Sequence, residues 1–413
     1  MQLQTLGLGL SLVVSLAVPT TAQTTWIVDA SGRPGAQFAQ IQDAIDAASA
    51  GDLVIVRDGF YRSFTLSKGL AIAGDAIAGR TVVDVTPGTV IHDVPTGQQV
   101  TLHNLFLGNL EVRQCDGVVA GSIINLIPPS TLLGPNDEFA LEVRDARDVR
   151  MRQFGINPGA GSGRGGVRVA NSRFEVDGCS IDGARGQGTG VGGTGLACDS
   201  GSVVVVSFGL VRGGAAPWSG VLAGPAITVA AGAALRVNGT IEAQVIGGFG
   251  GSCGVPAPAI VLAAGADARI SSQVRVTGGS VGCGPNAPAY GGAGSPDIAT
   301  PADPAMYVTG ENPFIGAVPG LEIQGEPGAL GALLVGVDSA TVPLGAFRAN
   351  PLRLVPLVAL PIGAFPASGA LAPSLPLPAP GVAPGALILL QTATLRGPGQ
   401  LFLSNATMFV GGA

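Results

Sequence analysis

The sequence predicts an all-β protein whose short strands wind into successive coils of a parallel β-helix. Short stretches of alternating apolar residues recur from about residue 70 to about residue 270, and small-residue corners separate them. The alternation places one face of each strand inside, because successive side chains of a strand point to opposite faces. A unit of this size cannot bury that face alone, so the copies must stack and share one core.

The clearest repeat begins at residue 110. The unit "LEVRQCDGVVAGSIIN" from 110 is followed by "LEVRDARDVRMRQFGIN" from 141, and the same frame returns from 167, 196, 227 and 260. We therefore expect residues 110, 141, 167 and 196 to lie in one column. The units differ in length, so the extra residues should loop out at one corner and line up along one side of the rod.

The chain begins with the features of a secretory signal peptide. Residues 1–22 contain an apolar stretch followed by Thr20-Thr21-Ala22, a small-residue cleavage site, although no Lys or Arg precedes the stretch. The stretch is too short and too rich in glycine to span a bilayer, and no later segment is long enough. The sequence thus predicts a secreted or cell-surface protein with no membrane span in the mature chain.

A short helix is expected before the first coil. Phe38, Ile41, Ala44, Ile45 and Ala48 fall at helical spacing and form one apolar face. Such a helix can cover the open end of a solenoid, where an unpaired strand would invite aggregation. Gly51 is expected to end the helix, and "DLVIV" from residue 52 is expected to form the first strand.

Residues 38–75 also carry a family resemblance. The stretch "FAQIQDAIDAASAGDLVIVRDGFYRSFTLSKGLAIAGD" resembles the N-terminal module of the pectin lyase-like right-handed parallel β-helix superfamily, which includes pectinesterases. The resemblance implies right-handed coils over residues 23–312 and carbohydrate-rich extracellular surroundings. It implies no active site, because the catalytic segments of pectinesterases, polygalacturonases and pectate lyases have no counterparts in the sequence.

The last hundred residues differ from the repeats in composition and pattern. Residues 313–413 consist of apolar segments punctuated by proline, which predicts a small antiparallel β-sandwich-like domain. This part resembles a C-terminal β module of secreted planctomycete-type bacterial proteins. The alternative is that it caps the far end of the rod.

Five cysteines are present. Cys253 and Cys283 occupy similar glycine-rich loops and are the candidates for a disulfide. A second possible pair is Cys179 with Cys198, although Cys198 takes the place of a core valine in the repeat, and Cys115 is expected to be a lone buried thiol. No CxxC motif or His/Cys cluster occurs, so no metal site is expected.

One charged segment offers candidate ligand-binding residues. The candidates in and beside "LEVRDARDVRMRQ" are Arg113, Arg144, Arg147, Asp116, Asp145 and Asp148. In the repeat register Arg144 stacks beside Arg113 and Arg147 beside Asp116. Two stacked arginines could grip a carboxylate by bidentate hydrogen bonds. The alternative is a solvated array of Glu–Arg pairs.

Composition limits the possible functions. The net charge of -6 and the pI near 4.9 leave no basic surface for a nucleic-acid partner. His92 and His103, the two histidines, are expected to be structural. The sequence predicts a non-catalytic β-helix that binds, or is displayed near, an extracellular polysaccharide or cell-surface component, and that needs no cofactor.

Two alternatives stay open. The protein could be a divergent polysaccharide lyase or glycoside hydrolase with acids on an outer groove, for which calcium is possible in the lyase case. It could also be a structural rod or adhesin. The fold alone cannot choose among them, because function depends on the site.

Overall fold

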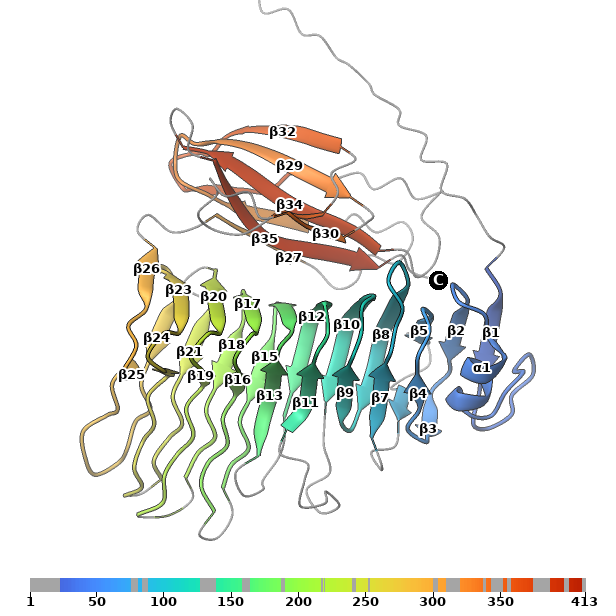
Figure 1. Cartoon of the computed structure of the whole chain (residues 1–413), viewed down its shortest axis with the longest axis horizontal. Helices are drawn as coiled ribbons and strands as arrows, with labels where there is room; N and C mark the ends of the chain where they lie inside the picture. Colours follow the sequence, from blue (N-terminus) through green and yellow to red (C-terminus); the bar gives the residue numbers. More distant parts are fainter. Residues whose placement is uncertain are drawn as a thin grey trace, which may run out of the picture.

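The structure is a computed structural model, and it consists of a parallel β-solenoid with a separate antiparallel module lying along it (Figure 1). It describes residues 23–75, 81–83, 88–126, 139–157, 164–186, 190–216, 218, 220–239, 243–251, 253–299, 304–309, 320–336, 339–342, 352–354, 358–373, 387–396 and 401–410. The predicted all-β class is thus confirmed. The expected signal peptide, residues 1–22, lies outside the described residues.

One long parallel sheet, sheet A, runs the length of the solenoid. Its first row of strands is β1 (Thr25–Val28), β2 (Leu53–Val56), β5 (Ala71–Gly74), β8 (Gln99–Leu107), β10 (Val118–Leu126), β12 (Asp148–Ile156), β14 (Arg173–Asp177), β17 (Val203–Ser207), β20 (Ala234–Asn238), β23 (Asp267–Ser271) and β26 (Asp297–Ala299). Its second row is β3 (Gly59–Tyr61), β6 (Thr81–Val83), β15 (Ser180–Asp182), β18 (Leu210–Arg212), β21 (Gln244–Ile246) and β24 (Arg275–Thr277). The long strands β8, β10 and β12 belong to both rows.

A second parallel sheet, sheet B, closes each coil. Its strands are β4 (Thr65–Leu66), β7 (Thr89–His92), β9 (Leu110–Arg113), β11 (Phe139–Arg144), β13 (Gly165–Ala170), β16 (Leu196–Cys198), β19 (Ile227–Val229), β22 (Ile260–Leu262) and β25 (Tyr290–Gly292). Leu110, Leu141, Val167 and Leu196 are register partners in this sheet. The predicted column is therefore confirmed.

The inward side chains of the two sheets form one continuous core. The largest fully buried residues include Tyr61, Phe154 and Phe174. Cys198 stands between Val169 and Val229 in an inward column, as its place in the repeat indicated. It forms no disulfide with Cys179, because both thiols are free and buried in the core. Burial raises the pKa of the Cys179 thiol to about 12, so this group stays protonated.

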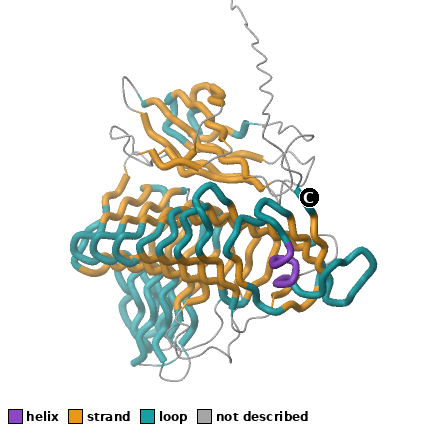
Figure 2. The backbone as a smooth tube through the Cα atoms, turned by 45° about the vertical axis from the view of Figure 1, so that its right-hand side comes forward, coloured by secondary structure: helices purple, strands orange, loops and turns teal. Residues whose placement is uncertain are grey.

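The N-terminal end of the solenoid differs from the expectation in two ways. Helix α1 (Ile41–Ala47) buries its apolar face as predicted, but it ends at Ala47, well before Gly51. Gly51 instead has a φ of 93° inside the turn that the bond from Asp52 N to Ser49 O closes. Strand β1, which the sequence did not reveal, precedes the helix and pairs with β2 as the true first strand. Figure 2 shows the helix at this end of the solenoid.

A column of left-handed residues turns the chain from sheet B to sheet A. Gln114, Asp145 and Asn171 have positive φ at successive coils, and glycines at 201, 232 and 265 continue the column. Asp and Asn tolerate this conformation better than most residues. The amides from Gln114 to Gly232 donate to a carbonyl of the next coil, as in the bond from Asp145 N to Ala170 O of 3.2 Å. The backbone conformation of this corner is therefore enough to explain the Asp, Asn and Gly residues there, and no ligand is needed to explain them.

In the part that the structure describes, the C-terminal module contains three antiparallel sheets. They comprise β27 (Ala305–Thr309), β28 (Gly320–Gln324) and β33 (Ala370–Leu371); β29 (Leu330–Gly336), β32 (Val358–Ala364), β34 (Leu387–Leu395) and β35 (Leu401–Val410); and β30 (Ser339–Val342) with β31 (Leu352–Leu354). The module has its own apolar core, which includes Met306, Ile323, Leu333 and Phe365. Antiparallel pairing begins at β27, before the expected boundary at residue 313. The module lies along the solenoid and does not cap its far end (Figure 1).

Candidate functional site

The predicted arginine pair lies on the outer face of sheet B. Arg113 and Arg144 are register partners, as are Glu111 and Glu142. Arg113 Nη1 lies 3.6 Å from Glu111 Oε1, and Arg144 pairs with Glu142 in the same way along its own strand. Both arginine side chains are about half exposed, 48% in each case. Each arginine thus shares its charge with an acid two residues before it.

The next coil extends this array with alternating charge. Arg168 follows Glu142 in the column, and its Nη1 lies 3.7 Å from Glu142 Oε1. Its Nε donates to Asp199 Oδ2 at 2.7 Å. Exposed pairs of this kind each stabilise a protein by less than about 1 kcal/mol. The face is a balanced array of Glu–Arg pairs, and this reduces the attraction that two stacked arginines would have for an anion.

The other predicted residues are dispersed. Asp145 belongs to the left-handed corner column, where its Oδ1 accepts a hydrogen bond of 2.7 Å from Asn171 Nδ2. Asp116 and Arg147 are exposed near that corner, and within the described chain they form no ion pair with each other. Asp148 is buried on a different face, at the start of β12. The six candidates therefore do not form one site.

Among the described residues of the solenoid, the face that holds Asp148 carries the densest set of buried polar groups. We call this set the polar interface; it comprises His103, Ser122, Asp148, Arg150, Arg152, Glu175, Asp177, Ser207 and Asn238. Six of these residues, from His103 to Asn238, share one register position across six successive strands of sheet A. All nine are less than 9% exposed. Polar side chains on an outer face are normally solvated, so something must cover them.

Ion pairs satisfy part of the polar interface. Arg150 makes a bidentate contact with Asp148, from Nε to Oδ1 at 3.0 Å and from Nη2 to Oδ2 at 2.9 Å. Its Nε also lies 4.0 Å from Glu175 Oε2. Burial opposes the charge of Arg150, but the two acids outweigh it and hold the pKa of Arg150 above its ordinary value. Arg150 is therefore charged.

The C-terminal module covers this face. Thr407 of β35 donates a hydrogen bond of 2.6 Å from Oγ1 to Asp177 Oδ2, across 230 positions of sequence. Leu389 of β34 packs with Ala120 of β10 in a small apolar cluster, against which Val118 also lies. Strands β34 and β35 contain no ionisable residue. An uncharged sheet thus lies over a charged one.

Two titratable groups of the polar interface have strongly perturbed pKa values. Burial raises the pKa of Asp177 to about 7, although the hydrogen bond from Thr407 and the charge of Arg152 oppose this shift. Burial, assisted by the charge of Arg152, lowers the pKa of His103 to about 4. His103 is therefore neutral near neutral pH, whereas Asp177 changes charge there.

The second notable surface is formed by the loops of four coils, which hang from the side of the solenoid away from the module (Figure 1). We call it the glycine flank; it comprises the described residues of 183–195, 213–225, 247–258 and 278–289. Each loop has an outgoing and a returning leg. Outgoing legs bond to each other, as from Ala216 N to Phe249 O, and so do returning legs, as from Gly192 N to Leu222 O.

Further hydrogen bonds join the two layers of legs. Gly214 N donates to Gly193 O, Gly224 N donates to Gly214 O, and Gly248 N donates to Gly224 O, at 2.7, 2.9 and 3.0 Å. This packing requires glycine for steric reasons. A Cβ on Gly214 would stand 2.0 Å from Ala184 O, and one on Gly224 would stand 2.1 Å from Gly193 O. The loops are therefore a hydrogen-bonded two-layer array rather than independent bulges.

Apolar side chains project from the glycine flank. Val191, Leu222 and Val255 occupy equivalent positions on three successive returning legs, where the hydrogen bonds and the Leu222–Val255 bridge align them. Each is about half exposed. Trp218 at the second loop is 63% exposed and Phe249 is 48% exposed. The flank thus presents an apolar surface to solvent.

The predicted disulfide candidates lie in the same flank. Cys253 and Cys283 are joined, with their Cα atoms 5.5 Å apart, and they link the third loop to the fourth. This bond adds a covalent connection to the array that the backbone hydrogen bonds already form. Cys115, by contrast, is a free buried thiol in the solenoid core.

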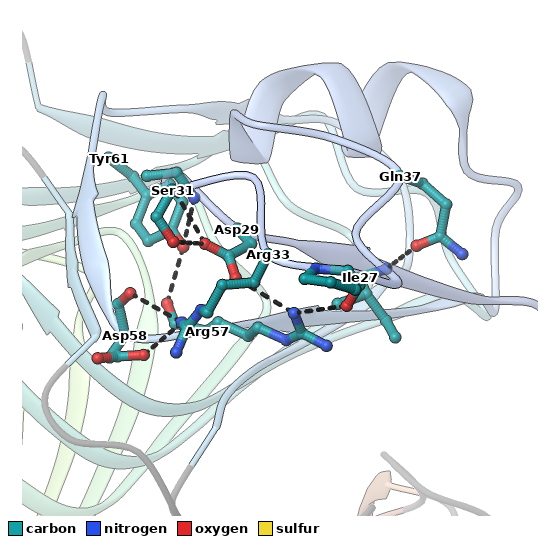
Figure 3. Close-up of polar contacts among 10 residues, drawn as sticks. Ile27, Asp29, Ser31, Arg33, Gln37, Arg57, Asp58 and Tyr61 are labelled. Carbon is teal, nitrogen blue, oxygen red and sulfur yellow. Dashed lines mark hydrogen bonds and ion pairs between the residues drawn. The ribbon is translucent and has the colours of Figure 1, made fainter.

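A third polar cluster fastens the N-terminal end and has a structural role. Figure 3 shows the buried Asp29 carboxylate between Ser31, Arg33 and Arg57. It accepts from Ser31 Oγ at 2.6 Å, from Arg33 Nε at 2.6 Å and from Arg57 Nη1 at 3.2 Å. Tyr61 Oη donates to Arg57 O at 2.8 Å. The hydrogen bond from Ser31, followed by those from Arg33 and Arg57, holds the pKa of Asp29 well below its ordinary value. These bonds outweigh burial, which acts in the opposite direction.

The described part of the chain contains neither a candidate metal cluster nor a candidate membrane-spanning helix. Its His, Cys, Asp and Glu side chains form no group of three or more that could hold a metal ion. None of the helices in the described ranges is long and apolar enough to cross a membrane. No protein-family model matches the chain, and no curated protein matches it.

Sequence reasoning missed both surfaces as sites. The alternation in "DVRMRQ" puts Asp148, Arg150 and Arg152 on one face of a strand, but it gives no sign that residues near 400 cover them. The flank had a usable signal in the paired glycines at 213–214, 247–248 and 278–279. Their recurrence at the same point of three successive coils indicates packing between loops.

Proposed function

We propose that this protein is a secreted or cell-surface β-helix, related to the pectin lyase-like superfamily, that binds an extracellular polysaccharide without cleaving it. The observation that carries the proposal is the apolar surface on the glycine flank. Exposed apolar patches of soluble proteins mark sites of interaction. Aromatic and aliphatic side chains bind the C–H faces of sugar rings, and backbone groups beside them can bond to hydroxyls.

The construction of the flank favours binding of a long, repetitive ligand. Val191, Leu222 and Val255 recur with the spacing of adjacent strands, about 4.8 Å. A polymer laid across the loops could therefore meet the same contact at each coil. Hydrogen bonds and the Cys253–Cys283 bond order the loops before the ligand arrives, which lowers the entropic cost of binding. A disulfide also fits an oxidising extracellular setting.

A polysaccharide lyase or glycoside hydrolase is the second candidate. The polar interface brings Asp148, Glu175 and Asp177 together with Arg150 and Arg152, which are residue types that such enzymes use. The C-terminal module lies over this face, however, and Thr407 bonds to Asp177. Catalysis there would require the module to move away, whereas the flank is exposed as it stands.

The proposal can be tested with the purified full-length protein and a panel of neutral and acidic polysaccharides, with and without calcium. We expect retention on at least one polysaccharide, no new reducing ends and no unsaturated products. Trp218→Ala should lower the affinity for the polysaccharide roughly fivefold or more, because loss of one stacked aromatic costs about 1 kcal/mol or more. The matched control is Phe60→Ala, which removes an aromatic side chain that is 81% exposed on β3, away from the flank.

A further pair of variants separates the two exposed surfaces. Arg113→Ala combined with Arg144→Ala removes the predicted arginine clamp on sheet B and leaves the flank intact. If this double variant loses binding to acidic polysaccharides while Trp218→Ala keeps it, sheet B is the binding surface and the assignment to the flank is wrong. Release of reducing ends or unsaturated products by the unmodified protein would support the enzyme instead.

A further inference from the structure

The C-terminal module and the solenoid meet as two separately built bodies. The module has its own apolar core, and the apolar cluster shared between the two bodies contains only Ala120 and Leu389 as fully buried members in the described chain. The partly buried Val118 and Leu334 pack against this cluster, and Thr407 donates a hydrogen bond to Asp177. Interfaces between domains with separate cores resemble transient protein–protein contacts, so we expect the module to separate without unfolding.

Asp177 is the titratable group at the centre of this contact. It is 6% exposed, its Oδ2 accepts the hydrogen bond from Thr407, and among the described residues it has no ion pair. Its outward position on β14 means that departure of the module would return the carboxyl group to water. A carboxylate buried without a paired cation is costly, and burial therefore favours the protonated form.

Among the described residues, the charged groups that act on Asp177 belong to the solenoid. They are Arg152 on the neighbouring β12 and Glu175 on its own strand. Arg173 Nε lies 4.0 Å from Glu175, the Cys179 thiol follows just after the strand, and His103 lies beyond Arg152. The strand on the other side, β17, presents the uncharged Ser207, and the module presents the uncharged Thr407. No residue of β34 or β35 titrates along with Asp177.

We propose that docking of the C-terminal module is coupled to protonation of Asp177, so that the module is held in mildly acidic surroundings and released as the pH rises. The module would then act as a pH-controlled cover over the charged face of the solenoid. This inference does not depend on the polysaccharide-binding function, because that function was assigned to the exposed flank.

The direction of the effect follows from linkage. With the module docked, the pKa of Asp177 is raised to about 7; undocked, it should return towards the ordinary range near 4. Docking thus takes up a proton between those two values, and the docking constant should fall roughly tenfold per pH unit over that range. Above about pH 7 it should level off. The pKa of His103, lowered to about 4, keeps this group neutral across the same window.

The test uses the full-length protein in a urea titration at several values between about pH 5 and about pH 8, with small-angle X-ray scattering to detect release of the module. Circular dichroism shows whether the solenoid stays folded. We expect the urea midpoint for release to fall from about pH 5 to about pH 7 in the unmodified protein. Asparagine has the shape of aspartate but cannot ionise, so in the Asp177→Asn variant the urea midpoint for release of the module should not change with pH. Asp46→Asn on the exposed side of α1 is the matched control and should behave like the unmodified protein.

A second variant keeps the proposal testable if Asp177→Asn fails to fold. Thr407→Val removes the hydrogen bond from the module but leaves the carboxyl group, so the midpoint should be lower at every pH. The proposal is wrong if the midpoint of the unmodified protein does not depend on pH, or if Asp177→Asn keeps the full dependence. It is also wrong if the module never separates before the solenoid unfolds.

Discussion

Replacement of Gly214 by alanine should disrupt the glycine flank while the solenoid stays folded. The added Cβ would lie 2.0 Å from Ala184 O and 2.5 Å from Gly193 N, and both atoms are backbone that cannot rotate away. The legs must move apart, and overpacking of this kind typically costs about 1–3 kcal/mol. The movement also strains the bonds from Gly214 N to Gly193 O and from Gly224 N to Gly214 O, each worth about 1 kcal/mol.

If both bonds are lost, these effects together destabilise the flank by about 3–5 kcal/mol. Alanine offsets less than about 1 kcal/mol of this by restricting the unfolded chain. The matched control is Gly284→Ala in the same flank. Its Cβ would meet only Val281 Cγ1 at 3.6 Å, an ordinary contact. We expect this control to change stability by less than about 0.5 kcal/mol.

Hydrogen exchange measured by mass spectrometry, together with retention on the polysaccharide, provides the assay. Peptides that cover residues 183–195 and 213–225 should lose protection in Gly214→Ala, and retention should fall with them. Protection in the core strands should stay unchanged, because the inward columns do not involve the legs. If Gly214→Ala keeps the protection and retention of Gly284→Ala, the loops do not form the close-packed array described above.

Two further predictions concern the ends of the molecule. Cys253→Ser should lower the stability of the last two loops by at most about 3–4 kcal/mol, which is the loop-closure value for a separation of 30 residues. The thermal unfolding midpoint and local hydrogen exchange measure this loss, and adding a reducing agent to the unmodified protein should reproduce it. Asp29→Asn should remove stability that the unmodified protein has at neutral pH. Because the folded-state pKa of Asp29 is depressed, that stability is present above the ordinary Asp pKa and is lost on acidification. The thermal midpoints of protein and variant should therefore converge as the pH falls, and a constant gap would contradict the assignment.

The repeating part of the fold was predictable because the same local pattern was sampled many times. A wrong alignment of one repeat would remove its residue from the column that joins Leu110, Leu141, Val167 and Leu196, so each repeat provides an independent check on the alignment of the others. The ends lack this redundancy. Strand β1 is a single short stretch before the repeat, and the position of Gly51 fitted a helix end and a turn equally well. Only the bond from Asp52 N to Ser49 O distinguishes them.

The candidate sites were less predictable, because they depend on contacts between distant parts of the chain. Asp148 was singled out for its charge, but its burial results from a module that begins about 150 residues later. Asp145 was singled out in the same way, yet the corner conformation is sufficient to explain its residue type. The concentration of charged residues in the sequence therefore pointed to the coil that holds the polar interface. It did not show that the interface lies on the outer face of sheet A or that the C-terminal module covers it.

The two sides of the solenoid place their polar and apolar groups in opposite ways, and this difference supports the assignment of roles. On the module side, charged residues that would ordinarily be solvated are covered by strands with no ionisable side chain. On the flank side, apolar residues such as Trp218 and Leu222 that would ordinarily be buried are exposed on loops held rigid by their own hydrogen bonds. Neither arrangement improves the stability of the solenoid itself, because buried charge and exposed apolar surface both carry a cost. A cost of this kind is expected at sites that bind something, and the flank is the one of the two that is open to a large ligand while the module is docked.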